Sequence, residues 1–254
     1  MSRWLLPDAL DRPARLRLLA VPFAGGGTGI YQRWPEAMPA GVSVLPVQLP
    51  GRERRMAERA YTAMGPLVRD LSAELLPRLG EVPWAVFGHS MGAAIAYELA
   101  RAGAQAGTPP ALLFVSARRA PGTAAHHPPL FALPTDQLVA ETERLYGALP
   151  AVLRAQPGLL RTFLPTMRAD FQLLDTWQAP TDRTLACPVV AYGGATDPAH
   201  PPDSMAPWAE VTTGPFVHRT FPGGHFTAVR DGVAVRDDVA AVLADHLAGR
   251  AAGA

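Results

Sequence analysis

The sequence has no lysine, a single cysteine and no long hydrophobic run. Its 23 cationic side chains are therefore all arginines, and together with the abundant alanine, proline and glycine they indicate a GC-rich coding sequence. A lone Cys187 excludes an intrachain disulfide, which fits a reducing compartment. No apolar run reaches the length of a membrane span, and the first residues lack the apolar core of a secretion signal. We therefore expect a cytoplasmic protein with no membrane partner.

The charge balance is nearly neutral, with a formal net charge of +1 over 254 residues. Such a chain lacks the strong positive field that attracts nucleic acids, so we expect no nucleic-acid partner. Hydrophobic residues make up 48% of the sequence, which is enough for a large core. The length fits one α/β domain, so we expect residues 1–254 to form a single domain, and we expect a monomer.

Apolar runs typical of buried strands alternate with helical patterns along the chain. One helix shows a clear apolar face, since Leu67, Leu71, Leu75 and Leu79 recur every four residues. The predicted strands span residues 16–23, 42–47, 84–87, 111–115, 188–192 and 216–221, and a terminal helix spans about 235–247. Strands that alternate with helices predict an α/β fold, with a mostly parallel central sheet covered by helices on both faces.

The strand pattern stops between about residues 121 and 183. Helical stretches at 136–146 and 159–177 occupy this segment, interrupted by several prolines. Helices inserted between two strands of such a sheet predict a lid over the active-site end. The alternative is a helical excursion with no gating role. Beyond the terminal helix, we expect residues 249–254 to be disordered.

The most informative pattern is the pentapeptide Gly88-His89-Ser90-Met91-Gly92, which lies between an apolar run and a helical pattern. A Gly-x-Ser-x-Gly between a strand and a helix is typical of a nucleophile elbow, a sharp turn that exposes its serine at the helix N-terminus. The helix dipole there favours a developing negative charge. The alternative is a surface serine in a glycine-rich turn. The strand and helix on either side favour Ser90 as a nucleophile.

A serine nucleophile needs a base to take its proton, and the base needs an acid to fix its tautomer. His225 lies in the loop Pro222–Phe226, directly after the last predicted strand, where a base should be presented. Asp197 follows the strand at 188–192, at the carboxyl edge of the sheet, and is the candidate acid. The alternative for Asp197 is an ordinary turn before a proline. The order Ser90, Asp197, His225 is the one found in α/β-hydrolases.

The other histidines are weaker candidates for the base. His200 lies in a proline-rich loop, His218 falls within a predicted strand, and His246 lies on the terminal helix. His126 and His127 fall in the predicted lid, and no further ligands stand at a spacing that would complete a metal site. We therefore expect no bound metal.

An oxyanion hole needs backbone N–H donors aimed at the reacting oxygen. Met91, which follows the candidate nucleophile, should supply one donor, and Ala24, in the loop after the first strand, should supply the other. Gly25–Gly27 continue that loop and would let the backbone approach a substrate closely. The alternative is that these glycines only form a turn. Cys187 stands at the start of a strand before a proline, which favours a buried, inert thiol.

Five arginines lie on loops that follow predicted strands: Arg52, Arg54, Arg55, Arg118 and Arg119. Loops of this kind gather at the carboxyl edge of the sheet, near the candidate nucleophile. These side chains form either an ordinary solvated surface or a docking patch for an acidic partner. Both alternatives place them at the surface.

Several motifs, in one order along nearly the whole chain, resemble those of the type II thioesterases of polyketide and nonribosomal peptide synthesis. They are Pro22–Gly26, Gln48–Glu53, Phe87–Ala93, Arg118–Pro121, Arg168–Phe171 and Gly223–Phe226. The resemblance implies an α/β-hydrolase fold with a helical lid. It also implies hydrolysis of acyl groups from the phosphopantetheine arm of acyl or peptidyl carrier proteins, an activity that clears stalled or aberrant acyl units.

The resemblance carries the catalytic triad onto Ser90, Asp197 and His225, and the oxyanion hole onto Ala24 and Met91. It implies no cofactor, because the substrate itself carries the phosphopantetheine. A second set of residues is a candidate for contacts with substrate or carrier protein: Phe23, Arg118, Arg119 and Phe226.

Two positions depart from the family's pattern. Gly27-Thr28 stands where Ser-Ala is frequent, and Trp177 stands where a tyrosine is common. These departures put the acyl preference in doubt and leave the triad intact. The alternative activities are those of a chain-releasing thioesterase, a medium-chain fatty acyl thioesterase or a small-ester hydrolase. From another class, the alternative is a catalytically silent binding scaffold on the same fold.

Overall fold

The computed structural model describes residues 2–124, 127–147, 156–182, 184–229 and 233–252. In these residues six strands form one sheet in the order β2-β1-β3-β4-β5-β6, and every adjacent pair is parallel. The strands are β1 (Leu16–Val21), β2 (Val42–Pro46), β3 (Trp84–His89), β4 (Leu112–Ser116), β5 (Val189–Gly194) and β6 (Phe216–Phe221). The predicted α/β fold with a mostly parallel sheet is thus confirmed.

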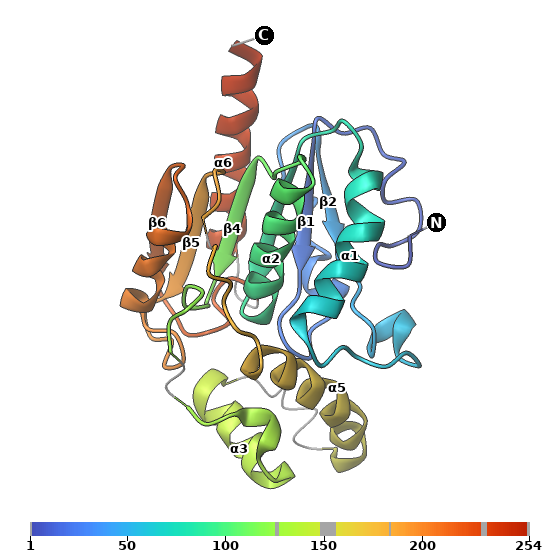
Figure 1. Ribbon diagram of the computed structural model, residues 1–254, viewed down its shortest axis with the longest axis vertical. Coiled ribbons are helices and arrows are strands. Elements are labelled where there is room, and N and C mark those ends of the chain that lie inside the picture. Colours follow the sequence, from blue (N-terminus) through green and yellow to red (C-terminus); the bar gives the residue numbers. More distant parts are fainter. Residues whose placement is uncertain (1, 125–126, 148–155, 183, 230–232, 253–254) are drawn as a thin grey trace.

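Helices cover both faces of the sheet (Figure 1). They are α1 (Met64–Leu79), α2 (Met91–Gln105), α3 (Thr135–Tyr146), α5 (Pro157–Asp175) and α6 (Val233–Ala252). Helices α1 and α2 share one core with the sheet, and α6 packs in a second core on the opposite face. Among the described residues, no helix is long and apolar enough to cross a membrane.

The continuous apolar runs of the strands follow from this double covering. Successive side chains of a strand point to opposite faces, so a strand buried on both faces needs apolar residues at every position. On β1, Leu19 and Val21 pack in the core of α1 and α2, whereas Leu18 and Ala20 pack in the core of α6. All four side chains are fully buried.

The register of the sheet brings the loops after the strands to one edge. Gly88, near the end of β3, pairs with Val21 at the end of β1, and Ser116 at the end of β4 pairs with His89. Helices α3 and α5 connect β4 to β5 and lie beyond this edge of the sheet (Figure 1). They correspond to the two helical stretches predicted for the insertion, whose last residue, 183, lies outside the described residues.

The C-terminus differs from the prediction. Helix α6 continues to Ala252, so the residues from Gly249 to Ala252 are helical where a disordered tail was expected. The reason is that Gly249 interrupts an alanine-rich run, Ala248 to Ala252, and one glycine weakens a helix by only about 1 kcal/mol. Residues 253–254 lie outside the described residues.

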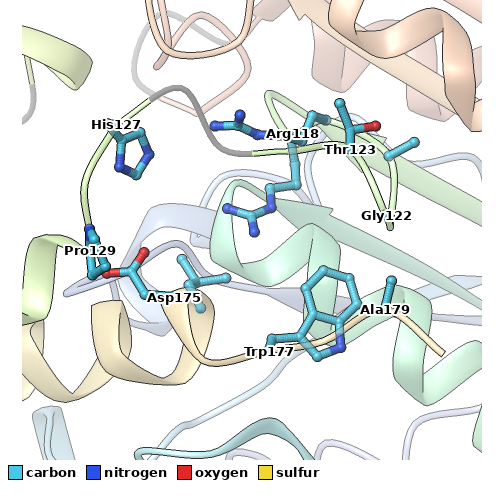
Figure 2. A pocket seen from close by; sticks show the side chains of 11 residues that line it. Arg118, Gly122, Thr123, His127, Pro129, Asp175, Trp177 and Ala179 are labelled. Atoms are coloured by element: carbon cyan, nitrogen blue, oxygen red, sulfur yellow. The ribbon is translucent and has the colours of Figure 1, made fainter.

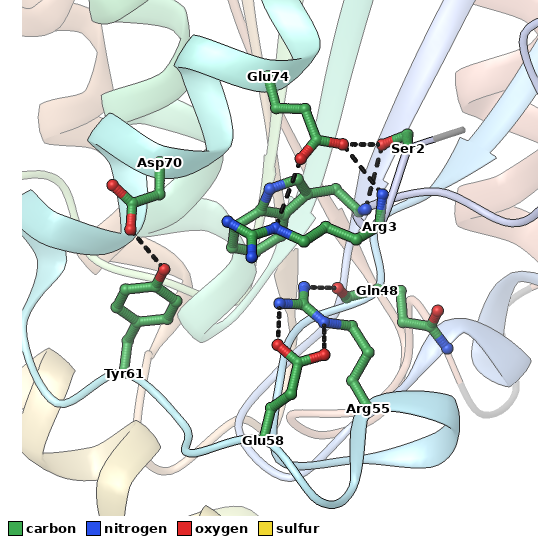
Figure 3. Close-up of polar contacts among 9 residues, drawn as sticks. Ser2, Arg3, Gln48, Arg55, Glu58, Tyr61, Asp70 and Glu74 are labelled. Carbon is green, nitrogen blue, oxygen red and sulfur yellow. Dashed lines mark hydrogen bonds and ion pairs between the residues drawn. The ribbon is translucent and has the colours of Figure 1, made fainter.

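The loop after β2 is fixed by the N-terminal segment (Figure 3). The Arg55 guanidinium lies 4.5 Å from the centroid of the Trp4 ring and donates to the Gln48 carbonyl at 2.9 Å. It also binds both carboxylate oxygens of Glu58, at 2.8 and 2.6 Å. This loop is therefore held rigidly, and it carries Arg52 into the functional site.

We expect Phe87→Ala to lower the free energy of unfolding by about 3–5 kcal/mol, because it removes a fully buried ring from the core of α6. The ring packs against those of Tyr31 and Trp34, at centroid distances of 6.0 and 4.6 Å. Urea denaturation measures the change. The control is Val217→Ala on β6, where the side chain is 41% exposed and the loss should stay within about 0.5 kcal/mol. Similar losses in both variants would contradict this account of the core.

Candidate active site

Ser90 occupies the sharp turn that the sequence predicts. Its φ is +55° and its ψ is −112°, a backbone conformation that a residue other than glycine rarely adopts. The Ser90 N–H donates to the Ser116 carbonyl at 2.8 Å, which ties the turn to the end of β4. Met91 then begins α2, so the serine lies at the N-terminus of that helix.

The two flanking glycines are required by close backbone packing. A Cβ on Gly88 would collide with the carbonyl of Gly92, and a Cβ on Gly92 would collide with the carbonyl of Val21. The first turn of α2 therefore lies directly against the ends of β1 and β3. This packing accounts for both glycines of the pentapeptide and excludes a loose surface turn.

Asp197 and His225 form a buried hydrogen-bonded pair. The His225 Nδ1 lies 2.7 Å from Asp197 Oδ2, and the two residues are 4% and 3% exposed. The other carboxylate oxygen, Oδ1, accepts the backbone N–H groups of Ala199 at 2.9 Å and His200 at 3.0 Å. Because Asp197 holds Nδ1, the Nε2 nitrogen of His225 is the one available to accept a proton.

The pair lies beside the elbow. The ring of His89, which precedes Ser90 in the chain, is 5.2 Å from the ring of His225. The aspartate–histidine pair therefore lies beside the turn that carries Ser90.

The structure gives the other histidines different partners. The Nδ1 of His200 lies 3.4 Å from the backbone N–H of Arg119, so its ring is not held by a carboxylate. His218 is half-buried on β6, and His246 is half-buried on α6. His127 contacts the Pro128 carbonyl through Nδ1, at 3.0 Å. His126 lies outside the described residues.

Phe23 and Phe226 form one wall beside the histidine. Their ring centroids are 4.8 Å apart, and the Phe226 ring lies 5.1 Å from that of His225. Phe23 also meets His89 edge-on at 5.8 Å. Both phenylalanines therefore lie beside the site. Their contacts in this structure are with each other and with the rings of His89 and His225.

Tyr146, at the end of α3, is a site residue that sequence analysis missed. Its ring lies 4.7 Å from the ring of His225 and stacks on Phe171 of α5 at 6.1 Å. Burial raises the pKa of Tyr146 to about 12, so its hydroxyl stays protonated at neutral pH. The insertion thus contributes a wall of the site, but nothing in the sequence pattern shows which residue of α3 reaches the histidine.

A buried ion pair joins the loop after β2 to helix α5. Arg52 donates two hydrogen bonds to the Asp170 carboxylate, at 2.7 and 2.8 Å, and the two side chains are 5% and 3% exposed. Asp170 Oδ2 also accepts the backbone N–H of Gly25 at 2.7 Å. The ion pair therefore fixes the peptide next to Ala24, the residue expected to supply an oxyanion donor.

The prediction that the five arginines lie at the surface is wrong for three of them. Arg52 is 4% exposed, Arg55 is 6% exposed and Arg119 is 5% exposed. Arg54 is exposed, and Arg118 is half-buried at the edge of a pocket. The physical reason is that Arg52 and Arg55 each meet a carboxylate, while Arg119 donates to the Ala124 carbonyl at 2.6 Å.

The two departures from the family's pattern lie in different surroundings. Gly27 leaves room for the Glu53 carboxylate, which accepts the Thr28 hydroxyl at 2.8 Å. The Trp177 indole donates to Glu98 at 2.9 Å, and its ring lines the same pocket as Arg118. The first departure therefore stabilises a loop, and the second shapes a cavity.

Two predictions about metal and thiol chemistry can be compared with the described residues. Within them, no group of three or more histidine, cysteine, aspartate or glutamate residues could hold a metal ion. Cys187 is buried, and burial raises the pKa of its thiol to about 11. The thiol is therefore protonated at neutral pH, as an inert cysteine should be.

A parallel sheet with a serine elbow after β3, and with a buried aspartate–histidine pair on the loops after β5 and β6, defines the α/β-hydrolase class. The sequence matches the thioesterase domain family over residues 16–243. The gramicidin S biosynthesis protein GrsT of Aneurinibacillus migulanus is 34% identical over 227 residues, which cover 89% of this chain and 88% of that protein.

Two solved structures are similar throughout. The RedJ thioesterase from the prodiginine pathway of Streptomyces coelicolor has 36% identity and a TM-score of 0.82, with 92% of this chain and 86% of that chain covered. The type II thioesterase BorB from the borrelidin biosynthetic cluster also has 36% identity and a TM-score of 0.82, with 96% and 97% covered. The chain therefore belongs to the thioesterase family, and the predicted α/β-hydrolase fold and thioester hydrolase activity are confirmed.

We expect Asp170→Asn to lower the free energy of unfolding by about 3–5 kcal/mol, because it leaves the Arg52 guanidinium buried without its counter-charge. The rate of thioester hydrolysis should fall as well, since the Gly25 N–H loses its anionic acceptor. Urea denaturation and an initial-rate assay measure the two effects.

The matched control is Glu141→Gln, which breaks the exposed ion pair between Glu141 and Arg144. That change should stay within about 0.5 kcal/mol, because exposed pairs are screened by solvent. Equal losses in the two variants would show that the buried pair does not have the role assigned to it.

We expect stability to fall as the pH drops below about 6.5, the usual pKa of histidine. Burial lowers the pKa of His200 well below that value, so the folded protein keeps this ring neutral while the unfolded chain takes up a proton. His200→Gln should reduce the pH dependence of the unfolding free energy by up to about 1.4 kcal/mol per pH unit. Urea titrations between pH 7.5 and pH 5 check this, and an unchanged slope in the variant would refute it.

Proposed function

We propose that this chain hydrolyses acyl groups from the phosphopantetheine arm of acyl or peptidyl carrier proteins, and so clears stalled or aberrant acyl units from an assembly line. The observation that carries the proposal is the buried hydrogen bond between Asp197 and His225 beside an elbow serine with positive φ. The relatives support the choice of substrate. GrsT is a gramicidin S biosynthesis protein, and BorB is a type II thioesterase of a biosynthetic cluster.

In the first half of the reaction, the Ser90 hydroxyl attacks the thioester carbonyl. His225 Nε2 takes the hydroxyl proton, and the Asp197 carboxylate stabilises the imidazolium that forms. The N–H groups of Met91 and Ala24 bind the oxyanion, and the first turn of α2 adds the positive end of its dipole. The imidazolium then gives its proton to the departing pantetheine sulfur, which leaves an acyl-serine.

In the second half, water attacks the acyl-serine. His225 again acts as the base, and the same two N–H groups bind the second oxyanion. The carboxylic acid leaves, and the proton returns to Ser90. These steps use side chains, backbone amides and water, and the only pantetheine involved belongs to the substrate.

The insertion and the surroundings complete the proposal. Tyr146 of α3 packs against the His225 ring, and Phe171 of α5 stacks on Tyr146, so the insertion shields the histidine from water on this side. Phe23 and Phe226 supply a further wall beside His225. We further propose that the enzyme works in the cytoplasm as a monomer, with carrier proteins as its partners and neither nucleic acid nor membrane involved.

The test compares an acyl carrier protein loaded with a short acyl group and a free ester of the same acid. We expect the wild type to prefer the carrier-bound thioester, and Ser90→Ala to lower kcat by at least about 10⁴-fold on it. Asp197→Asn should have a loss of similar order, because His225 would lose the partner that fixes its tautomer. Ser72→Ala, a serine on the surface of α1, is the control and should keep the wild-type rate.

The alternatives give different results in the same assay. A small-ester hydrolase would prefer the free ester. A chain-releasing enzyme would act on long or cyclising chains and leave short stalled units in place. A silent scaffold would give equal, slow rates in the wild type and in Ser90→Ala. That outcome would contradict both the catalytic role of Ser90 and the proposed substrate.

A further inference from the structure

A cavity of about 270 Å³ lies between the loop after β4 and the C-terminal end of α5. Arg118, Arg119, Asp175 and Trp177 are among its lining residues. Figure 2 shows the Arg118 side chain reaching into this cavity, with its guanidinium on the side formed by Asp175 and Trp177. The cavity is therefore polar, and it contains a permanent positive charge.

The Arg118 guanidinium has no acceptor within the part of the chain that the structure describes. Its Nε is buried and makes no hydrogen bond, and no ion pair forms with Asp175, whose carboxylate instead accepts the Phe131 N–H at 3.3 Å. The guanidinium carbon lies 6.0 Å from the centroid of the Trp177 ring. A guanidinium has five N–H donors in a fixed plane, and the end of this group lies in the cavity, where its donors can reach a ligand (Figure 2).

This arrangement is unfavourable unless something fills it. Taking a cation out of water without a counter-charge destabilises the folded state. Burial lowers the pKa of Arg118 to about 10, which still leaves it charged at neutral pH. Arg52 and Arg55, by contrast, each meet a carboxylate within the chain. Arg118 differs from them in having its donors aimed at an open volume.

The cavity adjoins the reacting centre. Tyr146, whose ring lies 4.7 Å from His225, is close enough to Arg118 that the guanidinium opposes the rise that burial causes in the pKa of the tyrosine. The loop that carries Arg118 follows Ser116, whose carbonyl binds the Ser90 N–H. The loop of Arg118 is therefore tied to the elbow, which makes a substrate that reacts at Ser90 the ligand to consider for this cavity.

We infer that this cavity binds an anionic oxygen group of the substrate, held by the Arg118 guanidinium over Trp177. The matching chemistry is a planar carboxylate on the acyl unit or a phosphate of the pantetheine arm, since guanidinium binds both through paired N–H donors. Arg119 adds a second positive charge to the wall, and Asp175 adds one negative charge that limits the attraction. This inference rests on the proposed function, because it names a further determinant of the same substrate.

Two pairs of thioesters test it, and each pair differs by one anionic group. The first pair is malonyl- and propionyl-N-acetylcysteamine, and the second is propionyl-4′-phosphopantetheine and propionyl-pantetheine. For one pair, Arg118→Gln should reduce the ratio of kcat/KM between the charged and neutral members by about ten- to a hundredfold, because a charge-assisted hydrogen bond is lost. The pair that responds identifies the source of the anion. Arg33→Gln, at an exposed arginine that does not line the cavity, is the control and should leave both ratios unchanged.

Two further variants separate binding from a structural role. Asp175→Asn should raise the same ratio, because it removes the negative charge that opposes the anion. Arg118→Met should raise the melting temperature by about 2–4 °C without ligand, because a half-buried charge that has no counter-charge is replaced by an apolar chain of similar length. If Arg118 had a structural role, Arg118→Met would lower the melting temperature. Arg118→Lys, which keeps the charge, should retain part of the preference for the charged thioester.

Binding to Ser90→Ala distinguishes this inference from the proposed function, because that variant binds without turnover. Isothermal calorimetry should show tighter binding of the charged member of the responding pair, and Arg118→Gln in the same background should abolish the difference. The inference is overturned if Arg118→Gln changes neither ratio or slows all four thioesters equally. It is also overturned if Arg118→Gln slows hydrolysis only of thioesters bound to a carrier protein, because that result would assign Arg118 to docking of the carrier protein.

Discussion

The close approach of α2 to the ends of β1 and β3 is the constraint on which the rest of the site depends. Neither Gly88 nor Gly92 has room for a Cβ, because each lies against a backbone carbonyl. Because the backbone is closely packed on both sides of the turn, the chain passes from β3 to α2 through a strained residue, and that residue is Ser90. The strain is sustained by the parallel sheet, whose register also aligns the loops that carry Asp197 and His225.

The remaining walls of the site come from the insertion between β4 and β5, and they are attached in two different ways. Helix α5 is joined to the loop after β2 by the buried pair of Arg52 and Asp170, and Asp170 also accepts the Gly25 N–H of the loop after β1. Helix α3 contributes Tyr146, which contacts His225 through ring packing. One attachment is ionic and directional, whereas the other is apolar and depends on how closely the rings fit.

The fold and the triad candidates were accessible from the sequence because their signals are local. Apolar runs of strand length gave all six strands, and the loop positions of Asp197 and His225 followed from the strands before them. The structure joins these two residues by a hydrogen bond, which the chain order of α/β-hydrolases had indicated. Each of these candidates lies within a few positions of the strand and turn that precede it, so a local sequence pattern can indicate it.

The residues whose position was predicted wrongly or missed depend on contacts between distant parts of the chain, which no local sequence pattern contains. Arg52 is buried because Asp170, 118 positions later, arrives on α5 with matching charge and geometry. Tyr146 reaches His225 only because the insertion folds back over the edge of the sheet. The helix at Gly249–Ala252 is a different kind of error, since a position near the terminus suggested disorder where the neighbouring alanines continue the helix.

The unequal attachment of the two helices has a consequence for how such an enzyme diversifies. Any substitution that shifts α5 also pulls on Asp170, and through it on the Gly25 peptide beside Ala24. Helix α3 is held to α5 by the fit of its apolar face and by an exposed hydrogen bond from Arg168 to Thr135, at 3.3 Å. We therefore expect the sequence of α3 to vary more freely than that of α5, which can change only in step with the loop after β1.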